Sequence, residues 1–160
     1  FNIIKNVSSI THANEISVLG CYIYVMYAIE LLEGKSKDEA YKYIQEKDYS
    51  VFFSENAILR YSRIIKEKIY EYDLQKISSS GYVVATLEAT LWVIHKTNSY
   101  NESIIGAINL GDDTDTVGAC VGGLAGIIYG EESINQEWKE TLKKENYIEE
   151  LCNNFDRILN

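Results

Sequence analysis

The stretch that decides the fold is Asn109-Leu110-Gly111-Asp112-Asp113-Thr114-Asp115-Thr116-Val117-Gly118, with the apolar run that continues it to Gly130. Glycine recurs at every fourth position of that run, at 118, 122, 126 and 130. Positions four apart lie on one face of an α-helix, where each interior glycine costs roughly 1 kcal/mol relative to alanine. The pattern therefore predicts a buried core helix whose bare face lets another backbone approach closely.

An acidic cluster lies at the start of this predicted helix, with carboxylates at Asp112, Asp113 and Asp115 and hydroxyls at Thr114 and Thr116. A carboxylate at a helix N-terminus is often a cap, because it accepts hydrogen bonds from exposed N–H groups and complements the helix dipole. A cap needs only one of the three carboxylates. The others repel it unless a hard cation such as Mg²⁺ or Ca²⁺ binds them together. Local chemistry alone leaves both a metal site and a capping cluster open.

The spacing excludes two common ligand-binding loops. An EF-hand that began at Asp113 would place Val117 and Leu124 where the calcium loop needs an oxygen donor and a glutamate. A phosphate-binding loop needs Gly-Lys-Ser/Thr, and no such sequence follows the acidic cluster.

Three sequence blocks, taken together, resemble the ADP-ribosylglycohydrolase family, which includes the dinitrogenase-reductase-activating glycohydrolase. The strongest block is Leu110-Gly-Asp-Asp-Thr-Asp-Thr-Val-Gly-Ala119 with the glycine run that follows it. A second is Ser79-Ser-Gly-Tyr-Val-Val84, and a third is Thr11-His-Ala-Asn14. The blocks occur in the family's order and cover most of the chain.

The resemblance implies a set of site residues. Asp113 and Asp115 would be carboxylate ligands and Thr116 a hydroxyl ligand of two Mg²⁺ ions, with Mn²⁺ as a substitute, whereas Asp112 occupies a variable position that is often glycine. The residues implied to line an ADP-ribose pocket are His12, Ser80, Gly81 and Tyr82. From the residues alone, the favoured interpretation of His12 is a solvated or capping histidine. That of Ser80 and Tyr82 is a serine helix cap before an aromatic core residue.

The resemblance also implies an activity, namely metal-dependent hydrolysis of the glycosidic bond between ADP-ribose and a modified protein side chain, with arginine as the expected acceptor. Family members are considerably longer, and their N-terminal half supplies further metal ligands and the acidic catalytic group. Those motifs do not occur in this sequence, so it resembles the C-terminal half of such an enzyme, and the catalytic residue itself is unknown. The expected partners are ADP-ribose or an ADP-ribosylated protein, and the other half of the enzyme or a second chain.

Two alternatives to an enzyme stay open. The first is a non-catalytic ADP-ribose- and metal-binding module or a degenerate half-enzyme. An upstream Asp-rich cluster would distinguish an active enzyme from such a module. The other alternative is a purely structural helical domain in which the acidic cluster is only a cap. The spacing of Asp113, Asp115 and Thr116 against the glycine helix makes this second alternative the weaker one.

Composition narrows the class of protein. The net charge is −9, from 24 acidic and 15 basic residues, so a nucleic-acid partner is not expected. The three cysteines include no C-x-x-C pair, which predicts neither a disulfide framework nor a zinc site and fits a reducing cytoplasm. We expect no membrane-spanning segment.

The chain contains no proline, and its apolar residues recur at helical spacing from end to end. We therefore predict a single all-helical domain over residues 1–160, arranged as an orthogonal multi-helix bundle of the ADP-ribosylglycohydrolase type that is incomplete at its N-terminus. After an extended or loop entry over residues 1–11, helices are expected over 14–33, 36–47, 54–73, 82–95, 99–110 and the glycine run, then from Ser133 and from Asn146.

Several side chains carry specific expectations. Glu88 is the only acidic residue in the predicted helix 82–95, and a buried carboxylate needs a partner. The charges of helix 54–73, Arg63 among them, are expected on a solvated face. Trp138 and Leu142 are expected to point inward.

Overall fold

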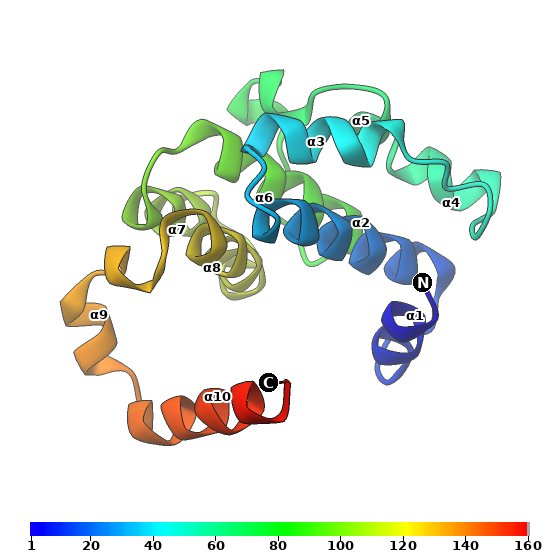
Figure 1. Ribbon diagram of the computed structural model, residues 1–160. Coiled ribbons are helices and arrows are strands. Elements are labelled where there is room, and N and C mark those ends of the chain that lie inside the picture. Colours follow the sequence, from blue (N-terminus) through cyan, green and yellow to red (C-terminus); the bar gives the residue numbers. More distant parts are fainter. Residues whose placement is uncertain (160) are drawn as a thin grey trace.

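The computed structural model describes residues 1–159 and is all-α, as predicted (Figure 1). Within those residues there are ten α-helices, three short 3₁₀ helices and no strand. The α-helices are α1 (Asn2–Ser9), α2 (Glu15–Leu32), α3 (Lys37–Glu46), α4 (Glu55–Arg60), α5 (Ser62–Ile65), α6 (Val83–Lys96), α7 (Tyr100–Asn109), α8 (Thr114–Tyr129), α9 (Gln136–Thr141) and α10 (Glu145–Leu159). The 3₁₀ helices are η1 (Ile69–Glu71), η2 (Leu74–Lys76) and η3 (Glu131–Ser133).

Helix α2 is the centre of the fold. It packs against α1, α3, α4, α6 and α8, and Leu19, Ile23 and Tyr27 on it are fully buried. By length and composition alone α2 would be able to cross a membrane, and it is the only described helix for which this holds. Its packing against five other helices accounts for its apolar composition, because a helix that is hydrophobic on all sides is typical of a protein core.

Three helix starts follow the predicted capping residues. The Asn14 side chain accepts a hydrogen bond from Ile16 N–H (2.9 Å) at the start of α2. Ser36 and Glu39 form a complete capping box on α3. Ser99 Oγ accepts from Glu102 N–H at the start of α7. Each of these side chains satisfies an N–H group that the helix itself leaves without a partner.

The entry segment differs from the prediction, because residues 2–9 form helix α1 instead of an extended strand or loop. Its position is fixed by Phe1, whose ring stacks on Phe52 with centroids 4.3 Å apart and meets Phe53 edge-on. Ile3 and Val7 on α1 remain largely exposed. The helix is therefore held at its beginning and presents an apolar stripe to solvent.

The predicted helix 54–73 is wrong, because the chain breaks there into α4, α5 and η1. Tyr61 is fully buried at the first break, where its hydroxyl donates to Ile16 O (2.7 Å). At the second break Ile69 N–H donates to the Tyr41 hydroxyl (3.1 Å), outside the ladder of a continuing helix. Contacts with other helices therefore override the local helical pattern.

The prediction that Arg63 lies on a solvated face is also wrong. Its guanidinium donates to Glu88 Oε2 (2.8 Å) and to Lys76 O (2.9 Å) and lies over the Tyr72 ring. Glu88 is almost fully buried on α6. The partner that this carboxylate was expected to need is therefore Arg63.

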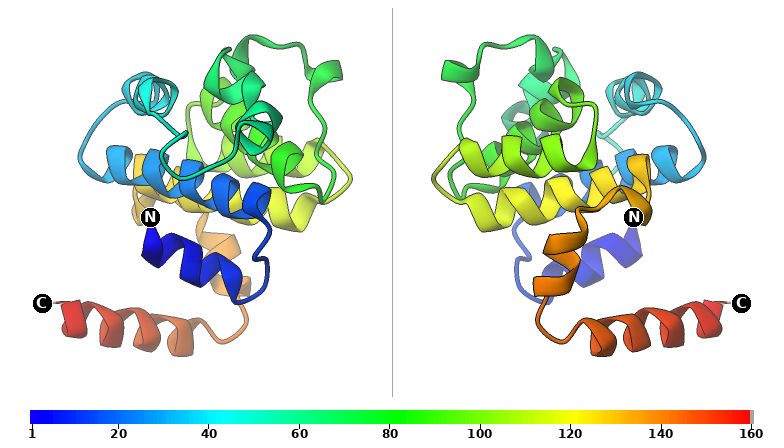
Figure 2. Two further views of the ribbon diagram at one scale, coloured as in Figure 1. Left: turned by 90° about the vertical axis from the view of Figure 1, so that its right-hand side faces the viewer. Right: turned by 90° about the vertical axis from the view of Figure 1, so that its left-hand side faces the viewer.

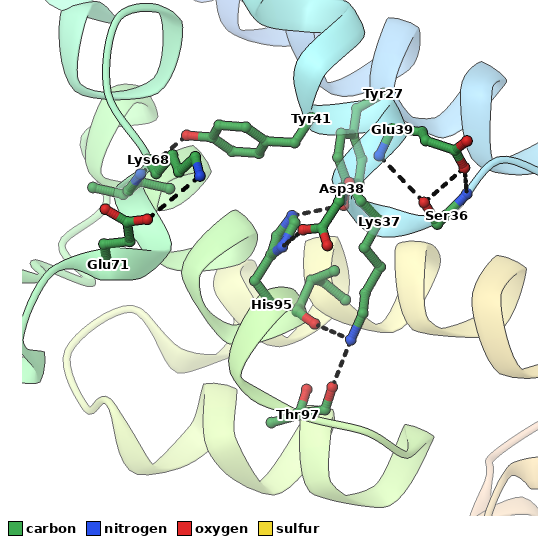
Figure 3. Close-up of polar contacts among 12 residues, drawn as sticks. Tyr27, Ser36, Lys37, Asp38, Glu39, Tyr41, Lys68, Glu71, His95 and Thr97 are labelled. Atoms are coloured by element: carbon green, nitrogen blue, oxygen red, sulfur yellow. Dashed lines mark hydrogen bonds and ion pairs between the residues drawn. The ribbon is translucent and has the colours of Figure 1, made fainter.

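A buried polar cluster closes the other end of α6 (Figure 3). His95 Nε2 lies 3.1 Å from the Tyr27 hydroxyl, and the imidazole stacks on Tyr70 with centroids 4.2 Å apart. Lys37 donates to Ile94 O (3.0 Å) and Thr97 O (2.8 Å). The lysine thus satisfies carbonyl groups at the helix C-terminus, where a positive charge also complements the helix dipole.

The glycine face of α8 is only partly packed. An added Cβ at Gly122 would contact the side chains of Ile104 and Tyr100, and one at Gly123 would lie 2.7 Å from the Tyr24 hydroxyl. At Gly118 and Gly126 nothing lies within 4 Å. The groups that approach this face closely are therefore side chains and not the backbone that was predicted. At Gly118 and Gly126 no group within residues 1–159 approaches it.

The C-terminal segment, residues 131–159, extends away from the other helices and returns beneath them (Figures 1 and 2). Helix α9 is capped by Asn135 and not by Ser133, which lies in η3. Trp138 and Leu142 are 36% and 51% exposed, so the prediction that they point inward is wrong. The apolar residues of α10 are also exposed, namely Tyr147, Ile148, Leu151, Phe155 and Ile158.

Candidate functional site

Helices α2, α6 and α8 begin at the same end of the molecule, toward the right-hand edge of the left view in Figure 2. Contacts agree with the view. A Cβ on Gly20 of α2 would lie 3.1 Å from a Val83 methyl group at the start of α6, and Asp113 N–H at the start of α8 donates to Ser79 O (3.1 Å). All three predicted sequence blocks precede or begin one of these helices, so the fold gathers them at one end.

The loop before α6 lies directly against the acidic cluster. A Cβ on Gly81 would be 3.1 Å from Asp113 Oδ2, which is tighter than an ordinary contact, so a larger residue would displace the carboxylate. Ser79 is buried, and its hydroxyl donates to Leu110 O (3.3 Å). Two segments about thirty residues apart in the chain are therefore joined at Leu110 and at Asp113.

The acidic cluster begins in a tight left-handed turn. Gly111 has φ +80° and Asp112 has φ +52°. Glycine adopts this region freely, and aspartate and asparagine tolerate it better than other residues. The backbone thus explains why glycine would suit position 112.

Asp113 and Thr116 form the centre of the acidic cluster. The Thr116 hydroxyl donates to Asp113 Oδ1 (3.0 Å), and Asp115 is exposed in the same first turn of α8. Asp113 occupies the N-cap position, but its side chain accepts no capping hydrogen bond from the helix. This geometry does not favour the capping interpretation of Asp113, and its carboxylate is held beside a hydroxyl.

The donor set suits a hard cation but is incomplete by itself. Two carboxylates and a hydroxyl offer the oxygen ligands that Mg²⁺ prefers, and Mg²⁺ commonly takes its remaining ligands from water or substrate. Within residues 1–159, no three Asp, Glu, His or Cys side chains form a group that would hold a metal ion. Asp113, Asp115 and Thr116 are therefore chemically suited to Mg²⁺, and their role as ligands stays a prediction.

The pocket residues predicted beside the cluster lie where a ligand has access. Tyr82, the N-cap residue of α6, is 50% exposed, so a ligand has access to its side chain. Ser80 and Gly81 precede it, and Ser80 O accepts from the Thr86 hydroxyl (3.3 Å). Among the described residues no side chain caps the start of α6 or α8. Free N–H groups at a helix start favour an anion.

His12 lies just before α2 at the same end of the molecule. Its Nδ1 is 3.0 Å from Thr11 Oγ1, and its carbonyl accepts from the Ser8 hydroxyl (3.0 Å). The side chain is exposed. The hydrogen-bond partners described for His12 are its sequence neighbours Ser8 and Thr11, and no described contact links it to Asp113. Its role in a pocket therefore stays a prediction.

Ser79 has a role that was not predicted from the sequence. This buried residue fixes the loop to the acidic turn through both its carbonyl and its hydroxyl. Its place in the Ser-Ser-Gly-Tyr block was the available signal, but nothing in that block shows which serine points inward.

Comparison with known proteins places the chain in a family. A sequence profile described as ADP-ribosylglycohydrolase matches residues 1–160. An ADP-ribosylarginine hydrolase Tri1 of Serratia proteamaculans is 32% identical over 148 residues, which are 91% of this chain and 37% of that protein. An ADP-ribosyl-[dinitrogen reductase] glycohydrolase of Rhodospirillum rubrum is 34% identical over 73 residues, which are 46% of this chain and 25% of that protein.

A solved structure shows the same fold. An ADP-ribosylglycohydrolase-related protein complex contains a chain that superposes with a TM-score of 0.78 at 26% identity, over 92% of this chain and 49% of that one. The 160 residues thus span less than half the length of these relatives, and the shared region is all-α.

Proposed function

Because the chain belongs to the ADP-ribosylglycohydrolase family, we propose that it provides the metal- and nucleotide-binding part of an enzyme that hydrolyses the glycosidic bond between ADP-ribose and a protein side chain. Arginine is the proposed acceptor, since relatives that match this chain are ADP-ribosylarginine hydrolases. The observation that carries the proposal is the contact between the Ser79–Gly81 loop and Asp113.

The residues have distinct proposed roles. The Tyr82 ring stacks on the nucleotide, and the free N–H groups at the starts of α6 and α8 attract the diphosphate. Asp113, Asp115 and Thr116 hold Mg²⁺, or Mn²⁺ as a substitute, in a site for two ions. When bound, the metal would orient ribose hydroxyls and lower the pKa of a water molecule.

Hydrolysis also needs an acidic group near the scissile bond, as glycosidases use carboxylates. We place that group outside these 160 residues, because Asp113 and Asp115 of the cluster are assigned to metal, and Asp112 lies in the turn before α8 at a position that the family resemblance leaves variable. The chain would then bind ADP-ribose by itself and contribute to turnover only with the rest of the domain. Water adds across the bond, giving free ADP-ribose and unmodified arginine.

The alternative is a non-catalytic ADP-ribose-binding module. The incomplete donor set favours it for the 160 residues taken alone. The two proposals differ in one observable, which is release of ADP-ribose from an ADP-ribosylated arginine peptide when the remaining part of a family domain is supplied.

The binding proposal is tested by calorimetry of ADP-ribose with and without Mn²⁺. We expect binding that strengthens with Mn²⁺ and that weakens at least about tenfold in Asp113→Asn, since loss of a ligand or its support typically costs that much. Asp112→Asn is the matched control, because it removes a neighbouring carboxylate at a position where asparagine also tolerates positive φ. Equal affinities for Asp113→Asn and the unmodified chain would refute the assigned metal site.

A further inference from the structure

One buried serine connects the two ends of the turn that leads to Asp113. Ser79 is only 3% exposed. Its hydroxyl donates to Leu110 O (3.3 Å), and its carbonyl accepts from Asp113 N–H (3.1 Å). Leu110 is the C-cap residue of α7, and Asp113 is the N-cap residue of α8. A single residue from another segment of the chain therefore contacts the turn both where it begins and where it ends.

The backbone of this turn depends on such contacts. Gly111 and Asp112 have φ +80° and +52°, and the left-handed region is unfavourable for aspartate unless surrounding contacts fix it. Gly111 N–H still donates back to α7, at Ile108 O (3.2 Å). Asp113 N–H is the first backbone donor described after the turn, and its acceptor is Ser79 O. The start of α8 is thus placed by Ser79.

The same loop also limits where the Asp113 side chain lies. The Thr116 hydroxyl donates to Asp113 Oδ1 (3.0 Å), and on the Oδ2 side a Cβ at Gly81 would lie only 3.1 Å away. Gly81 does not have a positive φ, so what position 81 requires is space. The carboxylate therefore lies between Thr116 and the loop, and the bonds of Ser79 fix how close that loop comes.

The loop has a second, separate attachment to α6. The Thr86 hydroxyl, which is buried, donates to Ser80 O and to Tyr82 O (3.3 Å each). Loss of the Ser79 hydroxyl would therefore release the loop from the turn before α8 without detaching it from α6. The consequence of such a change is expected to be local to Asp113.

We propose that Ser79 is a positioning residue of the candidate metal site, which holds the loop before α6 on the turn before α8 and so presents the Asp113 carboxylate in one orientation. Ser79 is assigned no contact with metal or substrate and acts through Asp113. The inference rests on the proposed function, in which Asp113 is a metal ligand. Groups that orient a metal ligand typically change metal affinity tenfold or more.

The test compares Ser79→Ala with a matched variant, Ser103→Ala. Ser103 is a fully buried serine of α7 whose hydroxyl donates to Ser99 O (2.8 Å). Helix α7 packs against α8, but no hydrogen bond described for Ser103 reaches the turn. Each variant loses one buried hydroxyl, and urea denaturation of both gives the loss of stability that this causes.

Two measurements then report on the site itself. The affinity for Mn²⁺ is obtained from the electron paramagnetic resonance signal of the free ion. We expect it to fall about tenfold in Ser79→Ala and to stay unchanged in Ser103→Ala. Amide hydrogen exchange by NMR should be at least about fivefold faster at Asp113 N–H in Ser79→Ala, because its acceptor is no longer held, and unchanged in Ser103→Ala.

A second variant is needed if Ser79→Ala does not fold by circular dichroism. Ser79→Cys then replaces it, since a thiol is similar in size to the hydroxyl and donates only weakly. The same two changes are expected, namely weaker Mn²⁺ binding and faster exchange at Asp113 N–H.

Three results would overturn the inference: equal Mn²⁺ affinities in Ser79→Ala and the unmodified chain, unchanged exchange at Asp113 N–H, or an equal loss of Mn²⁺ affinity in Ser103→Ala. The last would mean that general destabilisation is the cause. Absence of Mn²⁺ binding in the unmodified chain would instead refute the proposed function. Exchange at Asp113 N–H, which needs no metal, then decides by itself whether Ser79 fixes that residue.

Discussion

At the scale of the residue, the Arg63–Glu88 pair is the most consequential polar contact outside the site. Burial raises the pKa of the Glu88 carboxyl, and the Arg63 guanidinium opposes that rise. Arg63 is 32% exposed at its side chain and Glu88 only 6%. A carboxylate that is buried to this degree is tolerated only while its partner is present.

We expect Arg63→Ala to lower the free energy of unfolding by about 3 kcal/mol, the lower end of the range for breaking a buried ion pair, because water reaches Arg63. The control is Arg60→Ala, which removes an exposed arginine of the neighbouring helix and should change stability by less than about 0.5 kcal/mol. Urea denaturation measures both. Equal effects would mean that Glu88 does not depend on Arg63.

At the scale of the element, glycines decide how closely the central helices approach. On α2, a Cβ at Gly20 would lie 2.5 Å from the Tyr61 hydroxyl, which is itself fixed by its hydrogen bond to Ile16 O. On α8, the Cβ position of Gly126 is open. A side chain at position 20 would therefore clash with Tyr61, whereas a side chain at position 126 would meet no described neighbour.

Replacing Gly20 and Gly126 separately by alanine tests this difference in packing. Gly20→Ala should lower the unfolding free energy by about 1–3 kcal/mol, because overpacking forces Tyr61 to move. Gly126→Ala should raise it by up to about 1 kcal/mol in this chain, because alanine favours the helix and meets no neighbour. Thermal denaturation of both variants is the measurement, and a loss of stability in Gly126→Ala would show a contact that the structure lacks.

At the scale of the whole molecule, His95 joins parts of the chain that lie far apart in sequence. It contacts Tyr27 of α2, stacks on Tyr70 of η1 and lies 3.5 Å from Asp38 of α3 (Figure 3). Burial lowers the pKa of the imidazole from 6.5 to about 4, although the nearby Asp38 carboxylate raises it and Lys37 lowers it further. The imidazole is therefore neutral in the folded protein above that pH.

The pKa difference makes stability depend on pH. Between pH 6.5 and 4 the unfolded chain binds a proton at His95 and the folded chain does not, so stability falls as pH falls through this range and is fully present above it. We expect a loss of about 2 kcal/mol between pH 7 and pH 5. His95→Gln should flatten that slope, as measured by urea denaturation at both pH values, and an identical slope in the two proteins would exclude His95 as its cause.

The sequence by itself determined the helical class, most helix starts and the residues of the acidic cluster. Capping residues such as Asn14 and Ser36 act within one turn of the chain, so their effect is visible locally. The family followed from the blocks around Asp113, Tyr82 and His12, because the type and spacing of the residues carry that resemblance. The roles of those residues as ligands remain proposals.

Only the tertiary structure decided where the helix 54–73 breaks, which charge turns inward and which stripes stay uncovered. Tyr61 and Ile69 leave the helical ladder because their partners lie on other helices, and Arg63 turns inward because Glu88 is buried across from it. The stripe of α10 has a helical apolar pattern whether or not anything covers it. Periodicity reports which face of a helix is apolar, whereas the neighbour that covers this face depends on contacts between segments distant in the chain.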